Sequence, residues 1–273
     1  MAVFLFWNLN NKPLQETVGC LAARHEVDVL MFAECAIEPS ILLNTLNQSQ
    51  DNISQYYYAR SEGCEKIKIF TRFTDQFIQR IYEEDRLTIR HLKIPELTDI
   101  LIAVIHFSSK LHWCNDSQSF ECVELARTIK EAEEEVGHSR TVLIGDFNMN
   151  PFESGVVSAN GLHAVMSRYA AKKKTRVVNR REYPFFYNPM WSLFGDMSPG
   201  PPGTYYFSKS VQKVFFWNMF DQVLIRPDLL DLFSNEELKI LDSDGNKSLL
   251  SSRGVPDAKV VSDHLPILFK LKL

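Results

Sequence analysis

The feature that most constrains the fold of this chain is a series of short apolar runs, mostly four to eight residues long and rich in Val, Ile, Phe and Tyr. Runs of this length and composition are typical of buried β-strands. We predict strands over Val3–Trp7, Val27–Ala33, Tyr56–Arg60, Ile67–Phe70, Ile100–Phe107, Thr141–Ile144, Tyr205–Ser208, Phe220–Ile225 and Pro266–Leu271.

Helical periodicity is visible between these runs. Apolar residues share one face over Leu14–His25, a second helix is expected to begin near Pro39, and a third spans roughly Ser117–Val136 with an acidic outer face. Strands and helices alternate early in the chain and strands predominate later. This order predicts an α/β protein with more than one sheet, and 273 residues suit one large domain.

The composition narrows the class of protein. Hydrophobic residues at 45% and charged residues at 23% are ordinary for a soluble globular chain. The five cysteines include no C-x-x-C pair, which argues against a disulfide framework and a structural zinc site. No apolar run approaches the ~18 residues of a spanning helix, and the N-terminus lacks the features of a secretory signal. We therefore expect a cytoplasmic protein.

Polar residues of the kinds that bind metals or move protons lie at the ends of these runs. They are Asn8, Glu34, His106, Asp146 with Asn148, Asp221, and Asp263 with His264. Ligand sites in α/β sheets favour the edge beyond the strands' carboxyl ends. Because Asp and Asn are also common turn residues, turn polarity alone remains an alternative explanation.

The residue types point to a particular chemistry. Carboxylates and amides form an oxygen-only set, which suits Mg²⁺ or Mn²⁺ better than zinc. A hard cation together with histidine and carboxylates is what phosphoester hydrolysis requires. If the extended backbone continues past Gly145, Asp146 and Asn148 share one side of the strand and can face the same phosphate, while Phe147 packs the other way.

Several motifs occur in the order known from one family. They are "WN" at Trp7-Asn8, "FAE" at Phe32–Glu34, "IHF" at Ile105–Phe107, "IGDFNMNP" at Ile144–Pro151, "FDQVLI", and "SDHLPI" at Ser262–Ile267. With these motifs the chain resembles the endonuclease/exonuclease/phosphatase superfamily, whose fold is that of deoxyribonuclease I. The resemblance implies a single catalytic domain over residues 1–273, built as a four-layer αββα sandwich of two packed mixed β-sheets flanked by helices.

The resemblance also implies roles for the metal-side and water-side residues. Glu34 matches the principal metal-binding glutamate, Asn8 the asparagine that supports metal and phosphate, and Asp263 the second metal-side aspartate. Asp146 matches the aspartate that positions or deprotonates the attacking water, and Asn148 the amide that orients it. The implied cofactor is Mg²⁺ or Mn²⁺.

Two histidines carry the implied phosphate chemistry. His264 resembles the histidine that binds the scissile phosphate, and Asp221 resembles its carboxylate partner, which would favour a cationic imidazole near neutral pH. His106 stands where the deoxyribonuclease-I-like branch and many phosphatases carry histidine and some nucleases carry tyrosine. A buried structural histidine is the alternative for His106.

Two further residues match the family over shorter stretches. Glu62, in "YYYARSEG", stands where the deoxyribonuclease-I-like branch has an acid hydrogen-bonded to the histidine at His106; a plain surface glutamate is the alternative. Arg72, in "IKIFTR", resembles an arginine near the substrate phosphate; a solvated strand-end arginine is the alternative.

A basic segment contrasts with the formal net charge of −4. "KKKTRVVNRR", from Lys172 to Arg181, holds six cations in ten residues, and aromatic residues follow it. Cations near aromatics suit a single nucleic-acid strand. The residues that we predict to bind substrate here are Lys172, Lys173, Lys174, Arg176 and Tyr205. A solvated turn followed by an ordinary aromatic core is the alternative.

The substrate is less constrained than the reaction. "GDFN" with phenylalanine is commoner in nuclease-like members of the family, and the "WCDR" stretch of the inositol phosphatases is absent. We expect a metal-dependent nuclease that acts on DNA or RNA with low sequence specificity. A phosphatase or phosphodiesterase for small or lipid phosphates is the alternative, and a catalytically silent binding module is the third possibility.

Overall fold

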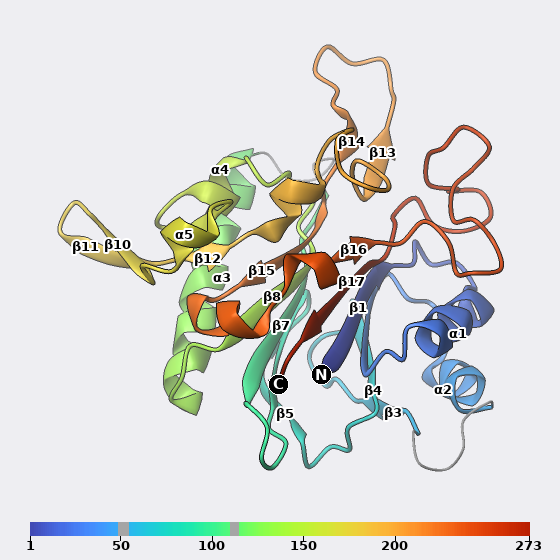
Figure 1. Ribbon diagram of the computed structural model, residues 1–273, viewed down its shortest axis with the longest axis horizontal. Helices are drawn as coiled ribbons and strands as arrows, with labels where there is room; N and C mark the ends of the chain where they lie inside the picture. The colour runs from blue at the N-terminus through green and yellow to red at the C-terminus, as the bar shows by residue number, and fades with distance from the viewer. Residues whose placement is uncertain (49–54, 110–114) are drawn as a thin grey trace.

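Two mixed β-sheets pack face to face in the computed structural model, which describes residues 1–48, 55–109 and 115–273 (Figure 1). The first sheet has six strands and the second has seven. In spatial order the first sheet contains β16 (Lys239–Ile240), β17 (Ile267–Leu271), β1 (Ala2–Asn8), β2 (Val29–Ala33), β4 (Ile67–Thr71) and β3 (Tyr57–Ala59). The second contains β5 (Ile78–Glu84), β6 (Leu87–Leu92), β7 (Ile100–His106), β8 (Thr141–Asp146), β15 (Asp221–Ile225), β12 (Phe186–Tyr187) and β9 (Ala164–Val165).

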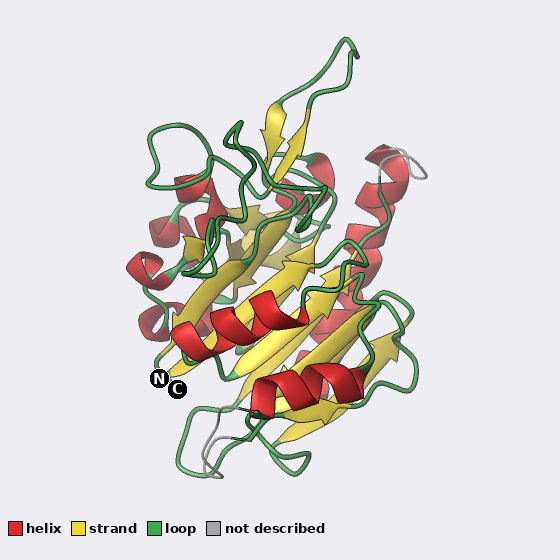
Figure 2. Cartoon of the chain, turned by 90° about the vertical axis from the view of Figure 1, so that its right-hand side faces the viewer, coloured by secondary structure: helices red, strands yellow, loops and turns green. Residues whose placement is uncertain are grey.

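Helices cover the outer face of each sheet, which completes the predicted four layers (Figures 1 and 2). The first sheet is covered by α1 (Gln15–Arg24) and α2 (Pro39–Asn47), and the second by the long α3 (Asn115–Val136). The remaining helices are short: α4 (Ser154–Val157), α5 (Arg168–Ala171), η1 (Pro189–Leu193), η2 (Pro227–Leu232) and η3 (Asn235–Glu237). Among the described helices, none is both long and apolar enough to cross a membrane.

Strand periodicity explains how three hydrophobic cores arise between four layers. In β1, Phe4 and Phe6 face the other sheet, whereas Leu5 and Trp7 pack toward α1 and α2. In β8, Ile144 joins the core between the sheets and Leu143 packs beneath α3. Successive side chains of a strand point to opposite faces, so a fully apolar run buries both of its faces. The predicted sandwich is therefore confirmed.

Four strands of the second sheet escape prediction from apolar runs: β5, β6, β9 and β12. β6 is buried throughout, yet it carries Thr88, Arg90 and His91. Arg90 can be buried because its guanidinium pairs with Glu83 of β5 and donates to the Arg60 carbonyl at 2.9 Å. β5 lies at the sheet edge and is mostly exposed, so its sequence alternates only weakly.

Two hairpins lie outside the sandwich (Figure 1). The basic segment forms the hairpin of β10 (Thr175–Val178) and β11 (Arg181–Pro184), and positive φ angles at Asn179 (49°) and Arg180 (64°) make its tight turn. The second hairpin pairs β13 (Tyr205–Phe207) with β14 (Phe216–Asn218) and projects beyond the ends of the sheets (Figure 2).

Gly145 is required by the close approach of β8 to β7. A Cβ atom at this position would collide with the carbonyl oxygen of Ile105. We expect Gly145→Ala to lower the free energy of unfolding by about 3 kcal/mol, because the obstruction is backbone that cannot turn aside. Urea unfolding followed by circular dichroism measures this loss. The matched control is Gly63→Ala, whose added Cβ makes only an ordinary contact at 3.4 Å and should change stability by less than ~0.5 kcal/mol. Equal stabilities for the two variants would contradict the steric account.

Candidate active site

Three neighbouring strands place three polar side chains in one row. His106 of β7 lies in register with Asp146 of β8, and Asp146 lies in register with Asp221 of β15. Counting by twos along each strand puts all three on the face that looks toward the first sheet, as extensions of the core between the sheets. Asn8 extends the facing strand β1 in the same way. His106 and Asp146 line a cleft of about 870 Å³, whereas Asp221 is fully buried.

Glu34 and Asp146 are brought together by shared partners. The Asn8 amide donates to Oδ2 of Asp146 at 3.0 Å and to Oε1 of Glu34 at 3.4 Å. His106 Nε2 lies 3.3 Å from Glu34 Oε1 and 3.9 Å from Asp146 Oδ2. The hydrogen bond from His106 holds the pKa of Glu34 below its usual value. Glu34 is therefore an anion at neutral pH, and its side chain is one third exposed to the cleft (33%).

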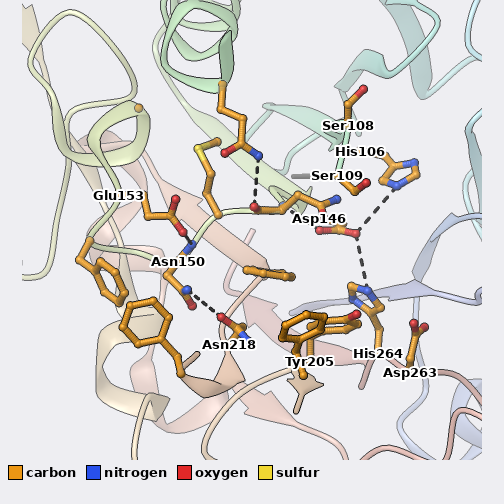
Figure 3. Close-up of a pocket in the computed structure, with 18 of the residues that line it drawn as sticks. His106, Ser108, Ser109, Asp146, Asn150, Glu153, Tyr205, Asn218, Asp263 and His264 are labelled. Atoms are coloured by element: carbon orange, nitrogen blue, oxygen red, sulfur yellow. Dashed lines mark hydrogen bonds and ion pairs between the residues drawn. The ribbon is translucent and has the colours of Figure 1, made fainter. Parts of the chain in front are cut away.

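His264 and Asp221 form the predicted ion pair. Nδ1 of His264 lies 2.7 Å from Oδ2 of the fully buried Asp221, and Nε2 lies 3.8 Å from Oδ2 of Asp146 (Figure 3). Burial alone would lower the pKa of His264, but the carboxylates of Asp221 and Asp146 outweigh it and raise that pKa to about 10. The imidazole is therefore a cation at neutral pH, and its Nε2–H faces the carboxylate of Asp146.

Hydrogen bonds between the motifs "WN" and "SDH" hold His264 in place. The indole Nε1–H of Trp7 donates to the His264 carbonyl at 2.8 Å. The Ser262 hydroxyl donates to the Asn8 carbonyl at 2.7 Å and accepts the His264 backbone N–H at 3.1 Å. "WN" and "SDH" are thus two halves of one buried contact at the end of the first sheet.

Asn148 reaches the cleft by a turn, so the expected continuation of the strand is wrong. β8 ends at Asp146, and Asn148 has a left-handed backbone with φ of 48°. Its N–H donates to Oδ1 of Asp146 at 2.8 Å, and its side-chain amide donates to the Phe107 carbonyl at 2.9 Å. Asx turns of this kind are favoured by Asp and Asn. The turn therefore also brings Asn148 into the cleft. Phe147, between the two polar residues, is buried under α3.

Tyr205 and Asp263, the other two predicted residues that line the cleft, lie beside His264. Tyr205 packs its ring against His264 at 4.8 Å between centroids and stacks on Phe220 at 5.2 Å. Asp263 lines the cleft beside His264 and is partly exposed (Figure 3).

Three amides that sequence reasoning missed also line the cleft. Gln118 of α3 donates to the Asn148 carbonyl at 3.2 Å, and Asn150 donates to Oδ1 of Asn218 at 2.9 Å (Figure 3). Asn150 also accepts the Met219 N–H at 2.9 Å. The second asparagine of "NMNP" was a visible signal for Asn150, but an isolated glutamine near the start of a helix gives none.

Two residues predicted near the substrate lie elsewhere. Glu62 is exposed and pairs with Arg80 at 2.6 Å rather than with His106, whose Nδ1 has no hydrogen-bond partner among the described residues. Arg72 follows β4, which runs antiparallel to β2, so its N–H bonds to Asp28 before β2 whereas Glu34 follows β2. The five residues of β2 separate these two ends by roughly 17 Å. The alternative of a surface glutamate describes Glu62. Arg72 does lie at a strand end, but it is not solvated, because only 19% of its side chain is exposed and its guanidinium lies 5.2 Å from the Tyr56 ring centroid.

The structure does not bring the basic segment to the cleft. Lys172, Lys173, Lys174 and Arg176 are exposed at and beside the β10–β11 hairpin, and none of them lines the cavity. Lys172 pairs with Asp231 at 3.7 Å, and Lys174 pairs with Asp228. Of the aromatic residues that follow, Phe185, Phe186 and Tyr187 lie in the cores and Tyr205 lines the cleft, so nearness in sequence did not predict nearness in space.

Within the described part of the chain, two clusters have the composition of metal sites, but in both of them a histidine nitrogen that a metal would need is already engaged. In the cluster of Asp146, Asp221 and His264, the imidazole is bonded to Asp221. In the cluster of His91, Asp99 and His138, the Arg140 N–H donates to Nδ1 of His138 at 3.2 Å, so the neutral ring carries its proton on Nε2, toward Asp99. That proton blocks the lone pair through which a metal would bind.

The carboxylate oxygens of Glu34 and Asp146 fit a hard cation better, whereas Asn8 turns its NH₂ group toward them and its Oδ1 accepts the Asn10 N–H at 3.0 Å. The two carboxylates share the Asn8 amide and His106, and Glu34 is open to the cleft. Oxygen ligands around a partly solvated position are the donor set of Mg²⁺ or Mn²⁺.

The ionisation of His264 can be measured directly by NMR titration of its ring protons in metal-free protein. We expect the ring to remain protonated at pH 8.5, because its pKa is raised to about 10. Asp221→Asn removes the main attraction and should move this pKa down toward the ordinary value of 6.5. Asp231→Asn, at an exposed carboxylate, is the control and should leave the titration unchanged. A wild-type midpoint near 6.5 would refute the ion pair.

Known structures with the same architecture were found by comparison of folds, whereas no family model and no curated protein matches the sequence. An endonuclease/exonuclease/phosphatase family protein from Leptotrichia buccalis matches all of both chains with a TM-score of 0.60 and 15% identity. The 3′ phosphatase NExo from Neisseria, bound to a product DNA hairpin, matches all of both chains with a TM-score of 0.58 and 12% identity. The endonuclease domain of TRAS1, a telomere-specific non-LTR retrotransposon, matches all of this chain and 99% of its own with a TM-score of 0.55 and 15% identity. The chain therefore has the fold of the endonuclease/exonuclease/phosphatase superfamily.

Proposed function

We propose that this protein is a divalent-metal-dependent phosphoester hydrolase, and that it acts as a nuclease of low sequence specificity on DNA or RNA. The observation that carries the proposal is that a cationic group and a proton acceptor lie side by side in the cleft. The cationic Nε2–H of His264 and the carboxylate Oδ2 of Asp146 lie 3.8 Å apart, both facing the cavity. A proton acceptor and a phosphate-binding cation at this separation can act on one phosphoester and one water.

Each side chain has a distinct task in this proposal. Asp146 takes the proton of the attacking water, and the Asn148 N–H on its other oxygen holds the carboxylate in orientation. His264 donates to a phosphoryl oxygen and opposes the negative charge that grows in the transition state, while Asp221 keeps its ring charged and correctly turned. His106 keeps Glu34 and Asp146 together through its Nε2.

Glu34 and Asp146 would hold Mg²⁺ or Mn²⁺, with Asp263 at the rim of the same cleft. When bound, such an ion neutralises charge on the phosphoryl oxygens and stabilises the leaving oxygen. Asn8 would hold the two carboxylates in position for the ion, because its side-chain NH₂ group donates to both of them.

A nucleic acid suits the cleft better than a small phosphate does. Arg86, Lys209 and Lys213 line it together with Tyr205 and Phe207, so that cations and aromatic rings surround the acids. Two proteins of similar fold are described as an endonuclease domain and as a 3′ phosphatase bound to a DNA product. Because the second of these proteins is a phosphatase, the alternative function of a phosphatase is included in the test.

We place the enzyme in the cytoplasm as part of the same proposal. Cys20, Cys35, Cys64 and Cys122 are all free thiols, as expected in a reducing compartment.

The test is a panel of single- and double-stranded DNA, RNA, and phosphorylated inositols, incubated with Mg²⁺ or Mn²⁺ and with EDTA. Strand cleavage that requires the metal supports the nuclease. Release of inorganic phosphate without strand cleavage would support the phosphatase. Tight cleavage at one sequence in a random oligonucleotide pool would contradict the low specificity.

The same panel distinguishes the proposed catalytic groups from contaminating activity. We expect Asp146→Asn and His264→Gln each to lower kcat by ~10²-fold or more, because each removes a group that acts in the transition state. Asp231→Asn is the matched control, since this exposed carboxylate lies outside the cleft. Near-wild-type turnover in either site variant would rule out its assigned role.

A further inference from the structure

One wall of the cleft is aromatic and has no part in the phosphate chemistry. Phe152, in the turn after β8, and Phe215, on the β13–β14 hairpin, both line the cavity. They remain 37% and 46% exposed, and their rings meet edge to face at 5.3 Å between centroids. The rings of Phe194 and Trp191 also pack against Phe152, at 6.2 and 6.3 Å between centroids.

These two rings do not serve the hydrophobic cores. Neither Phe152 nor Phe215 belongs to any of the three cores that fill the sandwich. Leaving two large rings half in water costs free energy that burial would recover, so an exposed aromatic wall inside a cleft indicates a binding surface. In a nucleic acid, the base rings are the flat apolar groups next to the phosphates, so they are the groups that would bind such a surface.

Cations accompany the rings on the same hairpin. Lys209 and Lys213 line the cleft, and their ammonium groups lie 5.9 Å and 5.6 Å from the ring centroids of Phe207 and Phe215. Neither lysine forms an ion pair with another described residue. Their charge is therefore available to a phosphate chain that runs along the hairpin.

We propose that Phe152 and Phe215 form a stacking platform for an unpaired base next to the scissile phosphate, and that Lys209 and Lys213 hold the flanking phosphates. The inference deepens the proposed function and rests on it, because it names single-stranded nucleic acid, or an unpaired end, as the substrate of that cleft. In a duplex both faces of each base are already covered. Since every base has a π face, stacking also accounts for weak sequence preference.

The experiment measures binding without turnover, by fluorescence anisotropy in EDTA. The probes are a short fluorescent oligodeoxyadenylate and a strand of the same length in which every nucleotide is an abasic analogue. We expect Phe152→Ala and Phe215→Ala each to weaken binding of the base-bearing strand by about 5- to 100-fold, and to leave the abasic strand almost unchanged. Lys209→Gln and Lys213→Gln should weaken both strands and reduce the salt slope by about 0.7 for each cation.

The control is Tyr57→Ala, an aromatic residue that is 37% exposed but lies outside the cleft, and it should bind both probes like the wild type. Melting temperatures establish that each variant is folded, and Phe215, on a projecting hairpin, provides a second test should Phe152→Ala unfold. An equal loss for the two strands, or no loss in either phenylalanine variant, would overturn the platform. Because the readout is binding, a failure to hydrolyse phosphoesters would count against the proposed function alone.

Discussion

The register that places β8 between β7 and β15 is the constraint on which the rest of the site depends. It lines up His106, Asp146 and Asp221 across three strands and turns all three toward the opposite sheet. A slip of one residue would send Asp146 to the face that α3 covers. Gly145 fixes this register sterically, because only a residue without Cβ allows the Ile105 carbonyl to come so close. The motif "GDFN" thus combines a packing requirement with the acid of the site.

At this edge of the sheets, the buried pair of Asp221 and His264 maintains the charge of His264 more than it stabilises the fold. Removing Asp221 and His264 from water costs free energy that their hydrogen bond offsets only in part, as is usual for buried ion pairs. The result is an imidazolium that stays charged well above neutral pH. Trp7 and Ser262 then tie His264 to the end of β1, and the pair of His264 with Asp221 joins this end of the first sheet to β15 of the second. The site is the polar end of the layer between the sheets.

The sequence predicts those parts of the fold and site that depend on local pattern. Apolar runs with polar ends located most strands, and the family motifs identified the residues that the cleft brings together. β6 was missed because its buried Arg90 is neutralised by Glu83 of a neighbouring strand, which is a tertiary fact. Arg72 was misplaced because a motif does not reveal that β4 runs antiparallel to β2. Glu62 and the basic segment lie outside the cleft, and the sequence did not reveal this because short matches and charge runs carry no information about which surface they occupy.

The central claim is that water held at Asp146 attacks a phosphorus atom beside His264. Hydrolysis of a single-stranded oligonucleotide in ¹⁸O-labelled water, followed by mass spectrometry of the products, tests it most directly. The account predicts one ¹⁸O atom in the phosphate group of each product pair, because the bond formed is between water oxygen and phosphorus. Label in the sugar hydroxyl with none in the phosphate would contradict the account, since it would mean that the carbon–oxygen bond breaks instead.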